Sequence, residues 1–306
     1  MGLFGIGGAV AIGANCTFKR KALESVGGHG IGLAEDLITS IRIHAAGWKS
    51  VYNPVVVSRG LVPEDFGSFC KQQLKWARGV FEVSFVELPK LYKHLTGWQR
   101  LSYFIIGTYY LNGVITCFFT LFPFLYFMTG LTPTNIPFTE FVTRGGTFII
   151  IAITIYLYVQ KFMSDVESER GFHFKGMVLK YACWPVFLLG FLLSVVNADI
   201  PYIPTAKKAS IGSVSPFVRP LYLHVGIFMI SIASLFIYRK FYMTEYDLLE
   251  TRVAVWAMIA FASFSFIMSV LGIYAASESK RMKAEDCWDF VDLNTITIED
   301  KTLLKK

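Results

Sequence analysis

The chain has 306 residues, and its composition excludes a wholly water-soluble protein. Apolar residues make up 54% of the sequence, aromatic residues 16% and charged residues only 17%. The counts of 25 glycines and 11 prolines exclude collagen-like and low-complexity classes. The net charge is +7, without a run of five cations. We interpret this excess as charge that flanks membrane segments rather than as a nucleic-acid-binding surface.

The five cysteines are odd in number and never spaced as C-x-x-C. This pattern predicts neither a zinc site nor a disulfide framework. Reduced thiols fit a protein whose soluble part faces the cytoplasm.

Residues 1–100 predict an α/β half-domain. Residues 3–18 and 48–57 are expected to be strands, because they are rich in small or β-branched residues and border turn signals. Helices are expected at residues 19–26, 35–46 and 66–88, from apolar periodicity and flanking Gly residues. Pro89 is expected to close the last of these helices.

Residues 101–276 predict an α-helical transmembrane bundle, because apolar stretches long enough to cross a roughly 30 Å core recur there. The fold class is therefore α/β followed by a helical bundle, with residues 277–306 as a cytoplasmic tail. Four crossings are expected, at residues 101–128, 147–163, 220–238 and 253–275.

The apolar stretch at residues 178–196 can either cross the bilayer or lie in its interface. Lys/Arg residues occur in the loops on both sides of it, so a crossing would place one basic loop outside, against the positive-inside tendency. We therefore predict an interfacial helix, interrupted near Trp184 and Pro185.

Three groups of residues are candidates for chemistry. Glu35 and Asp36 start a helix after a Gly-rich loop, where the carboxylates serve either as helix-capping charges or as a general base. Gln72, Lys75 and Trp76 share one helix face. They form either a sugar-binding face or a solvated helix with a core Trp.

The third group follows the interfacial stretch, in the loop at residues 200–208. Thr205 and Lys207 could contact a diphosphate through a hydroxyl and an ammonium. The alternative is a lysine pair that anchors the chain at the membrane surface.

The order of these groups resembles the membrane-embedded family 2 glycosyltransferases, the group of cellulose, chitin and hyaluronan synthases. The resemblance runs from Gly13 to about Ala275 and is strongest in AEDLITSIRIHAAGW, QQLKW and PYIPTAK. It implies that residues 1–100 are part of a glycosyltransferase A-type domain, on the acceptor side. The family motif T-E-D implies Asp36 as catalytic base, with Glu35 beside it.

The family motifs Q-x-x-R-W and F-x-V-T-x-K carry over to the other two groups. They imply acceptor contacts for Gln72, Lys75 and Trp76, and a gating loop with Thr205 and Lys207. Ala34 and Lys75 stand where the family has Thr and Arg, and Lys replaces a planar bidentate donor by a point charge.

The sequence contains no D-x-D, the family's motif for the nucleotide and its metal. We therefore expect a fragment that is inactive alone, with the divalent metal (Mg or Mn) held by residues outside this chain, in a missing N-terminal half.

The resulting prediction is a multi-pass protein of the cytoplasmic membrane that transfers sugar from a nucleotide-sugar donor, UDP-sugar by resemblance, to a growing glycan acceptor. Coupling to export of the polysaccharide is expected. The alternatives are a non-processive transferase that glycosylates a lipid carrier, and a non-catalytic polytopic membrane protein.

Overall fold

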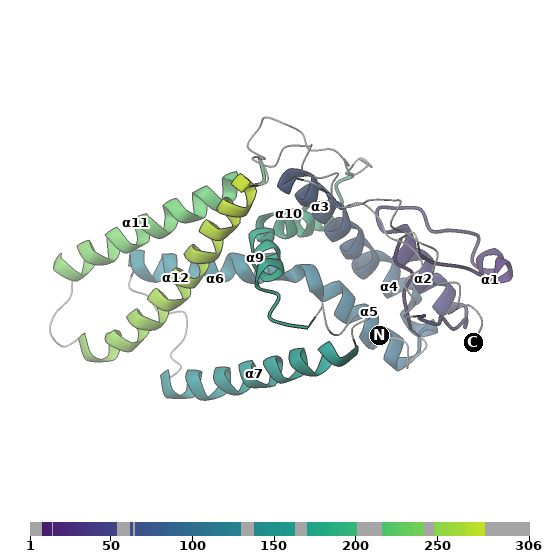
Figure 1. Cartoon of the computed structure of the whole chain (residues 1–306), viewed down its shortest axis with the longest axis horizontal. Coiled ribbons are helices and arrows are strands. Elements are labelled where there is room, and N and C mark those ends of the chain that lie inside the picture. Colours follow the sequence, from purple (N-terminus) through teal and green to yellow (C-terminus); the bar gives the residue numbers. More distant parts are fainter. Residues whose placement is uncertain are drawn as a thin grey trace, which may run out of the picture.

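The computed structural model of the chain describes residues 8–13, 15–53, 62–63, 65–129, 138–162, 170–200, 216–241 and 248–278. Helices make up all the regular elements in these ranges (Figure 1). The prediction of an α/β fold for residues 1–100 is therefore wrong for the described part of the chain. The only trace of β-structure there is an isolated parallel bridge between Gly8 and Ser50.

This bridge joins the two segments that were expected to be strands. A parallel pair needs further neighbouring strands to become a stable sheet, because two strands bury too little apolar surface. The described residues supply no third strand, so Gly8 and Ser50 pair at a single position. Residues 54–57 of the second expected strand lie outside the described residues.

Two short helices begin the described structure, as expected. Helix α1 spans Arg20–Ser25 and is followed by Gly27 and Gly28, whose φ angles of 81° and 99° suit glycine. Helix α2 spans Glu35–Ala45 and buries one face through residues such as Ile38 and Ile41.

The next helical segment runs further than Pro89 was expected to allow. Helix α3 spans Phe66–Glu82, a π-helical turn η1 covers Val83–Glu87, and α4 covers Leu88–Leu91. Pro89 lies in the first turn of α4, the part of a helix that tolerates proline best. The prediction that Pro89 ends the helix is therefore wrong. A 3-10 turn η2 at Tyr92–His94 follows.

The first long apolar segment consists of α5 (Gly97–Thr108), the 3-10 turn η3 (Tyr109–Leu111) and α6 (Asn112–Thr129). Thr96 and Gln99 form a capping box at the start of α5. Pro123 lies inside α6.

The remaining helices carry most of the apolar sequence. They are α7 (Phe138–Val159) with the 3-10 turn η4 (Gln160–Phe162), α9 (Phe174–Ala182), α10 (Trp184–Val195), α11 (Arg219–Phe241) and α12 (Leu248–Glu278). The axes of α9 and α10 meet at 44°. Cys183 lies at this break, beside the Trp184 and Pro185 that were expected to interrupt the helix.

Helix α10 packs against both α3 and α6, and so connects the first hundred residues to the apolar helices (Figure 1). Small residues allow the close approach. A Cβ on Gly190 would lie 2.9 Å from the Ala77 Cβ of α3, and one on Gly113 of α6 would lie 2.4 Å from the Leu188 backbone nitrogen of α10. The main core cluster forms around these crossings, with Phe81, Phe187 and Leu221 among its buried side chains.

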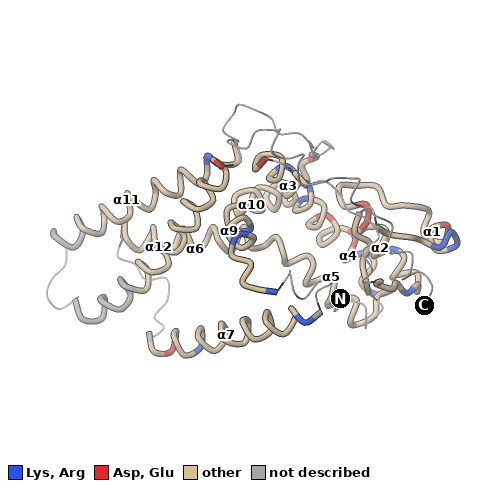
Figure 2. Tube along the Cα trace, in the orientation of Figure 1, with Lys and Arg blue, Asp and Glu red and all other residues tan. Residues whose placement is uncertain are grey.

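In the described residues, three helical segments are long and apolar enough to cross a membrane: Gly97–Thr129, Val142–Val159 and Ala257–Glu278. The bent pair α9–α10 passes the same test as one broken segment, and Arg219–Ser234 is a shorter apolar helix. Figure 2 shows charged residues near the start of α7 and in η4 after its end, and many further charges around α1 to α4. The number of crossings, the interfacial position of residues 178–196 and the cytoplasmic tail remain predictions.

Candidate functional site

The acidic pair lies in the first turn of α2. Glu35 is exposed and Asp36 is half-buried. The Oδ2 atom of Asp36 accepts a hydrogen bond from the Gly13 backbone N–H at 3.0 Å, and Oδ1 accepts one from the Leu37 N–H at 2.7 Å. The N-cap residue is Ala34, which cannot cap with its side chain. Asp36 thus stabilises the helix N-terminus through one N–H, and its second oxygen is held by a separate segment.

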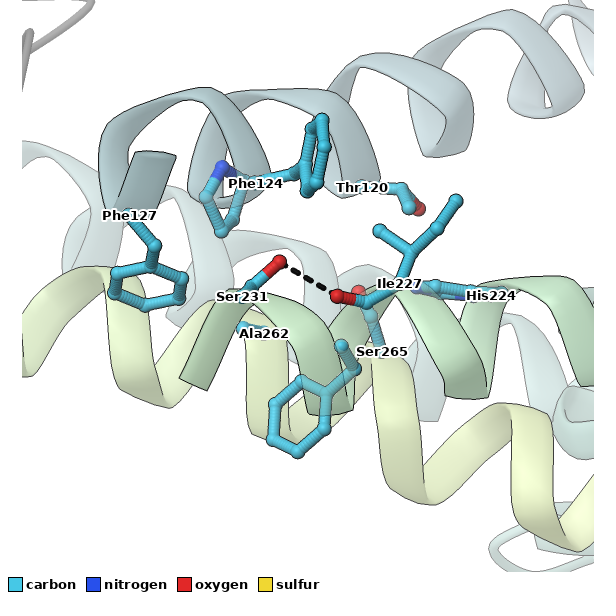
Figure 3. Close-up of a pocket in the computed structure, with 10 residues that line it drawn as sticks. Thr120, Phe124, Phe127, His224, Ile227, Ser231, Ala262 and Ser265 are labelled. Atoms are coloured by element: carbon cyan, nitrogen blue, oxygen red, sulfur yellow. Dashed lines mark hydrogen bonds between the residues drawn. The ribbon is translucent and has the colours of Figure 1, made fainter. Parts of the chain in front are cut away.

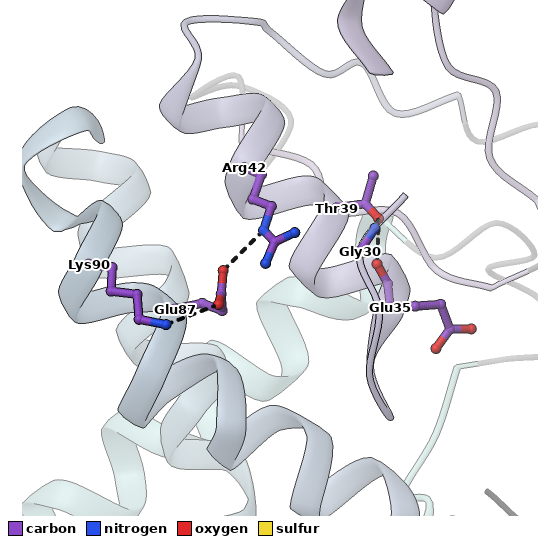
Figure 4. Close-up of polar contacts among 6 residues, drawn as sticks. All are labelled: Gly30, Glu35, Thr39, Arg42, Glu87 and Lys90. Atoms are coloured by element: carbon purple, nitrogen blue, oxygen red, sulfur yellow. Dashed lines mark hydrogen bonds and ion pairs between the residues drawn. The ribbon is translucent and has the colours of Figure 1, made fainter. Parts of the chain in front are cut away.

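The loop before the pair is fixed by close packing on α2 (Figure 4). The Gly30 N–H donates to the Thr39 hydroxyl at 2.8 Å, and this hydroxyl donates to the Glu35 carbonyl. A Cβ on Gly30 would lie 2.5 Å from the Ile38 side chain, so only glycine fits this approach. The carboxylates therefore project from a tightly packed turn.

Helix α2 is also tied to the segment that follows α3. The Arg42 guanidinium pairs with Glu87 at 3.1 Å, and Lys90 pairs with the other oxygen of Glu87 at 3.7 Å (Figure 4). Both pairs lie near the surface, where each contributes about 0–1 kcal/mol. They fix the orientation of α2 more than they stabilise the fold.

Helix α3 carries the second candidate group. Trp76 is 43% exposed, while Gln72 and Lys75 are half-buried. Gly79, one turn after Trp76, packs directly on the residue before the acidic pair, because a Cβ there would lie 2.7 Å from the Ala34 Cβ. This contact brings the α3 face that carries Trp76 to the turn that carries Glu35 and Asp36.

Sequence reasoning did not single out Arg78, which is 5% exposed. Its Nε donates to the Ala198 carbonyl at 3.2 Å, and its terminal NH1 nitrogen lies 3.4 Å from an oxygen of Glu82. The signal that could have found it is a cation between Ala77 and Gly79, two small residues whose neighbours approach closely. Arg78 attaches α3 to the residues that follow α10.

Thr205 and Lys207 lie outside the described residues. Of the seven predicted site residues, the structure thus describes the five on α2 and α3, and it packs Gly79 of α3 on Ala34, the residue before α2. The residues it describes include no group of three or more metal-ligating side chains.

The pKa values of two groups, the exposed Cys16 and the buried His44, are shifted by their surroundings. Burial and the negative charge of Asp36 raise the pKa of the Cys16 thiol, whose Sγ–H donates to the Gly13 carbonyl. Burial lowers the pKa of His44 to about 4, so the ring is neutral at physiological pH.

A small pocket lies elsewhere, between α6, α11 and α12 (Figure 3). Phe124, Phe127 and Phe228 line it together with Thr120, His224, Ser231 and Ser265, and the Ser231 hydroxyl donates to the Ile227 carbonyl. The pocket lies among apolar helices and does not include the acidic pair. We therefore do not place the reaction in it.

Comparison with known proteins identifies relatives of the region that holds the acidic pair and Trp76. The profile of "Glycosyl transferase family group 2" matches residues 5–163, about half of the chain. The catalytic subunit of a UDP-forming cellulose synthase from Komagataeibacter sucrofermentans is 29% identical over 119 residues, which cover 39% of this chain and 16% of that protein.

Two further relatives are similar. The corresponding catalytic subunit from Xanthomonas axonopodis pv. citri is 31% identical over 103 residues, covering 33% of this chain and 14% of that protein. Putative mixed-linked glucan synthase 1 from Oryza sativa subsp. japonica is 31% identical over 187 residues, covering 58% of this chain and 21% of that protein. The chain thus spans only 14% to 21% of the length of these relatives.

Proposed function

Because the chain belongs to glycosyl transferase family group 2 and is related to cellulose and glucan synthases, we propose that α2 and α3 form the acceptor side of a membrane-bound inverting transferase. The observation that carries the proposal is the packing of Gly79 on Ala34, which joins the acidic turn to the helix of Trp76. The donor is a nucleotide sugar, a UDP-sugar by similarity to the relatives, and the acceptor is a growing glycan.

In this proposal Asp36 is the general base. Its carboxylate takes the proton of the acceptor hydroxyl while the hydroxyl oxygen attacks the anomeric carbon of the donor. The new glycosidic bond forms as the bond from that carbon to the diphosphate oxygen breaks, and the nucleoside diphosphate leaves with the electron pair. The carboxylate is held in one orientation, because the Gly13 and Leu37 N–H groups donate to its two oxygens.

Trp76 and Gln72 hold the acceptor ring. The exposed indole offers an apolar face to the ring hydrogens, and the amide of Gln72, one turn away, offers hydrogen bonds to hydroxyls. We also assign Lys75, on the same helix, and Glu35, next to Asp36, to substrate contacts. Thr205 and Lys207 are proposed to contact the diphosphate.

We further propose that the apolar helices anchor the protein in the cytoplasmic membrane, with α1 to α4 on the cytosolic side. The cations Lys161 and Lys175 at the ends of α7 and α9 fit that side by the positive-inside tendency. Processive synthesis coupled to export is proposed on the likeness of PYIPTAK to the gating loop. Residues outside this chain are proposed to supply the nucleotide and metal site.

Acceptor binding tests this proposal without requiring turnover. A soluble cello-oligosaccharide, titrated against the detergent-solubilised chain, should bind, and Trp76→Ala should weaken it about tenfold, the loss of roughly 1.4 kcal/mol of stacking. Trp98→Ala is the matched control, because Trp98 is 64% exposed but lies on α5. Equal affinity of both variants and the unchanged chain would remove Trp76 from the acceptor site.

Turnover is the second test. We expect no transfer from UDP-glucose by the 306-residue chain alone, because its sequence has no D-x-D. Measured transfer that Asp36→Asn abolishes would correct the fragment proposal and support the base. Transfer that survives Asp36→Asn unchanged would contradict the role of Asp36.

A further inference from the structure

Three polar side chains form one stripe along α2: Asp36, Ser40 and His44, each four residues after the last. The segment before α1 is bonded directly to Asp36 and Ser40, and to His44 through Ser50. The Gly13 N–H donates to Asp36 at 3.0 Å and the Ala11 N–H donates to the Ser40 hydroxyl at 2.8 Å. The Ala9 carbonyl accepts from Ser50, whose hydroxyl lies 2.7 Å from His44 Nε2.

The spacing explains why every second residue of this segment finds a partner. Four residues of α-helix rise about 6 Å, and two residues of extended chain advance about 6.6 Å. The segment Ala9–Gly13 therefore runs antiparallel to α2 in register with one side-chain stripe. We call these three connections the α2 ladder.

The hydrogen bonds of the α2 ladder also determine which of its groups donate and which accept. Ser40 donates to the Asp36 carbonyl at 2.8 Å, so its oxygen is free to accept from Ala11. Ser50 gives its only proton to Ala9, so it must accept from His44 Nε2–H. His44 Nδ1 then accepts from the Tyr103 hydroxyl of α5 at 2.7 Å. Ser40 and His44 are 4% and 2% exposed, so water cannot replace these partners.

From this arrangement we infer that Ser40 and His44 are positioning residues, which hold the segment Ala9–Gly13 so that the Gly13 N–H stays on the carboxylate of Asp36. The inference rests on the proposed role of Asp36 as base. Because the Gly13 N–H is held in place, it fixes the orientation of the Asp36 carboxylate. One lone pair of each carboxylate oxygen remains for the acceptor hydroxyl.

Cys16 provides a measurement that does not depend on catalysis. It is exposed, its thiol is bonded to Gly13, and its pKa is raised by burial and by the charge of Asp36. The rate at which its thiolate displaces iodide from iodoacetamide, followed against pH by mass spectrometry of the Cys16 peptide, reports how close Asp36 lies. Asp36→Asn should shift this profile to lower pH.

The experiment is a double-mutant cycle on the detergent-solubilised 306-residue chain. Ser40→Ala should remove most of the shift that Asp36→Asn produces, because the segment with Gly13 and Cys16 is no longer held at Asp36. His44→Ala should act in the same direction. Ser40→Thr, which keeps the hydroxyl, should retain the full shift.

Thr39→Val is the matched control. It removes a buried hydroxyl from the same helix, but one bonded to Gly30 rather than to the ladder. It should leave the Cys16 profile and its response to Asp36→Asn unchanged. Should Ser40→Ala fail to fold, Ala11→Pro removes the donor instead of the acceptor and lies outside α2.

The inference is overturned if Asp36→Asn shifts the Cys16 profile as much in Ser40→Ala or Ala11→Pro as in the unchanged chain. It is also overturned if Asp36→Asn does not shift the profile at all. Neither result bears on acceptor binding, so the proposed function stands or fails separately by the Trp76 titration. The inference is supported if Asp36→Asn no longer shifts the Cys16 profile in Ser40→Ala but still shifts it in Ser40→Thr and in Thr39→Val.

Discussion

Two of the candidate membrane segments have nearly the same mean hydropathy and opposite surroundings. Gly97–Thr129, which contains α5 and α6, has a mean hydropathy of 1.7, and Val142–Val159 of α7 has 1.6. In the first, 28% of the most apolar window is buried against protein, whereas in the second none is. Figure 1 shows α6 among α10, α11 and α12, and α7 along the lower edge of the view.

The difference teaches that hydropathy and packing are separate properties of an apolar helix. Hydropathy determines whether a helix tolerates a bilayer, since lipid tails are as apolar as leucine. Packing requires shape. In α6 the small residue Gly113 admits α10, and the buried Tyr126 and Phe127 fill the contact with α11 and α12. In α7 large side chains such as Phe148 and Ile150 point outward, 73% and 67% exposed.

The largest expected effect separates two phenylalanines on these helices. Phe127 of α6 is 1% exposed, so Phe127→Ala should lower the free energy of unfolding by about 4 kcal/mol through lost contacts and a cavity. Phe148→Ala on α7 should change it by less than about 0.5 kcal/mol. Thermal unfolding of the detergent-solubilised protein measures both. Equal destabilisation by the two variants would show that α7 is packed after all.

The free energy of unfolding is expected to fall by about 3 kcal/mol at low pH, because of the bond between His44 of α2 and Tyr103 of α5. His44 accepts from Tyr103 of α5, and burial lowers its pKa from 6.5 to about 4. The unfolded chain therefore binds the proton first. The contribution of neutral His44 is complete above pH 6.5, falls as the pH drops, and is lost by about pH 4.

Denaturant unfolding at a series of pH values measures this dependence. His44→Gln has no imidazole to titrate, so its stability should vary less between pH 6.5 and 4 than that of the unchanged chain. His29→Gln is the control, because His29 is exposed and should leave the dependence as it is. An identical slope in His44→Gln would exclude His44 as its source.

Because α6 is closely packed, Gly113→Ala should lower the free energy of unfolding by about 2 kcal/mol. A methyl group on Gly113 would meet the Leu188 backbone at 2.4 Å, so Gly113→Ala must push α6 and α10 apart. Gly145 of α7 has no atom within 4 Å of the same position. Gly145→Ala should therefore be neutral or stabilise by about 0.5 kcal/mol through helix propensity. Unfolding temperatures of the two variants make the comparison, and a loss at Gly145 would contradict it.

These contrasts mark what the sequence could predict. Helices α1 and α2 follow from periodicity and from Gly27, Gly28 and Gly47, because these signals are local. The apolar segments follow from length and composition. Nothing local distinguishes α6 from α7, since burial depends on which distant helix fits against each surface.

The wrong strand predictions and the missed site contacts also arise because they depend on residues far apart in the sequence. The strands at residues 3–18 and 48–57 were predicted from composition, but a strand needs partners, and the described chain pairs only Gly8 with Ser50. In the candidate site, the motifs identified Asp36 and Trp76. Arg78 bonds Ala198, 120 positions away, and Gly13 of the α2 ladder bonds Asp36, 23 positions away, and no local pattern reveals such contacts.

The smallest expected effect concerns how α7 is held. The Tyr156 hydroxyl donates to the Gly171 carbonyl at 3.1 Å, accepts from the His173 N–H at 3.3 Å and also contacts the His173 ring at Nδ1, all exposed to solvent. Tyr156→Phe should lower the global free energy of unfolding by only about 0.5 kcal/mol, because water replaces exposed partners. The His173 amide should nevertheless exchange its hydrogen faster, since it loses its acceptor. Tyr222→Phe, on exposed Tyr222 of α11, is the control and should leave that amide unchanged. An unchanged exchange rate of the His173 amide in Tyr156→Phe would mean that contacts other than this hydroxyl hold α7. Helix α7 would then be attached more firmly than its exposed side chains indicate, and it would differ less from α6.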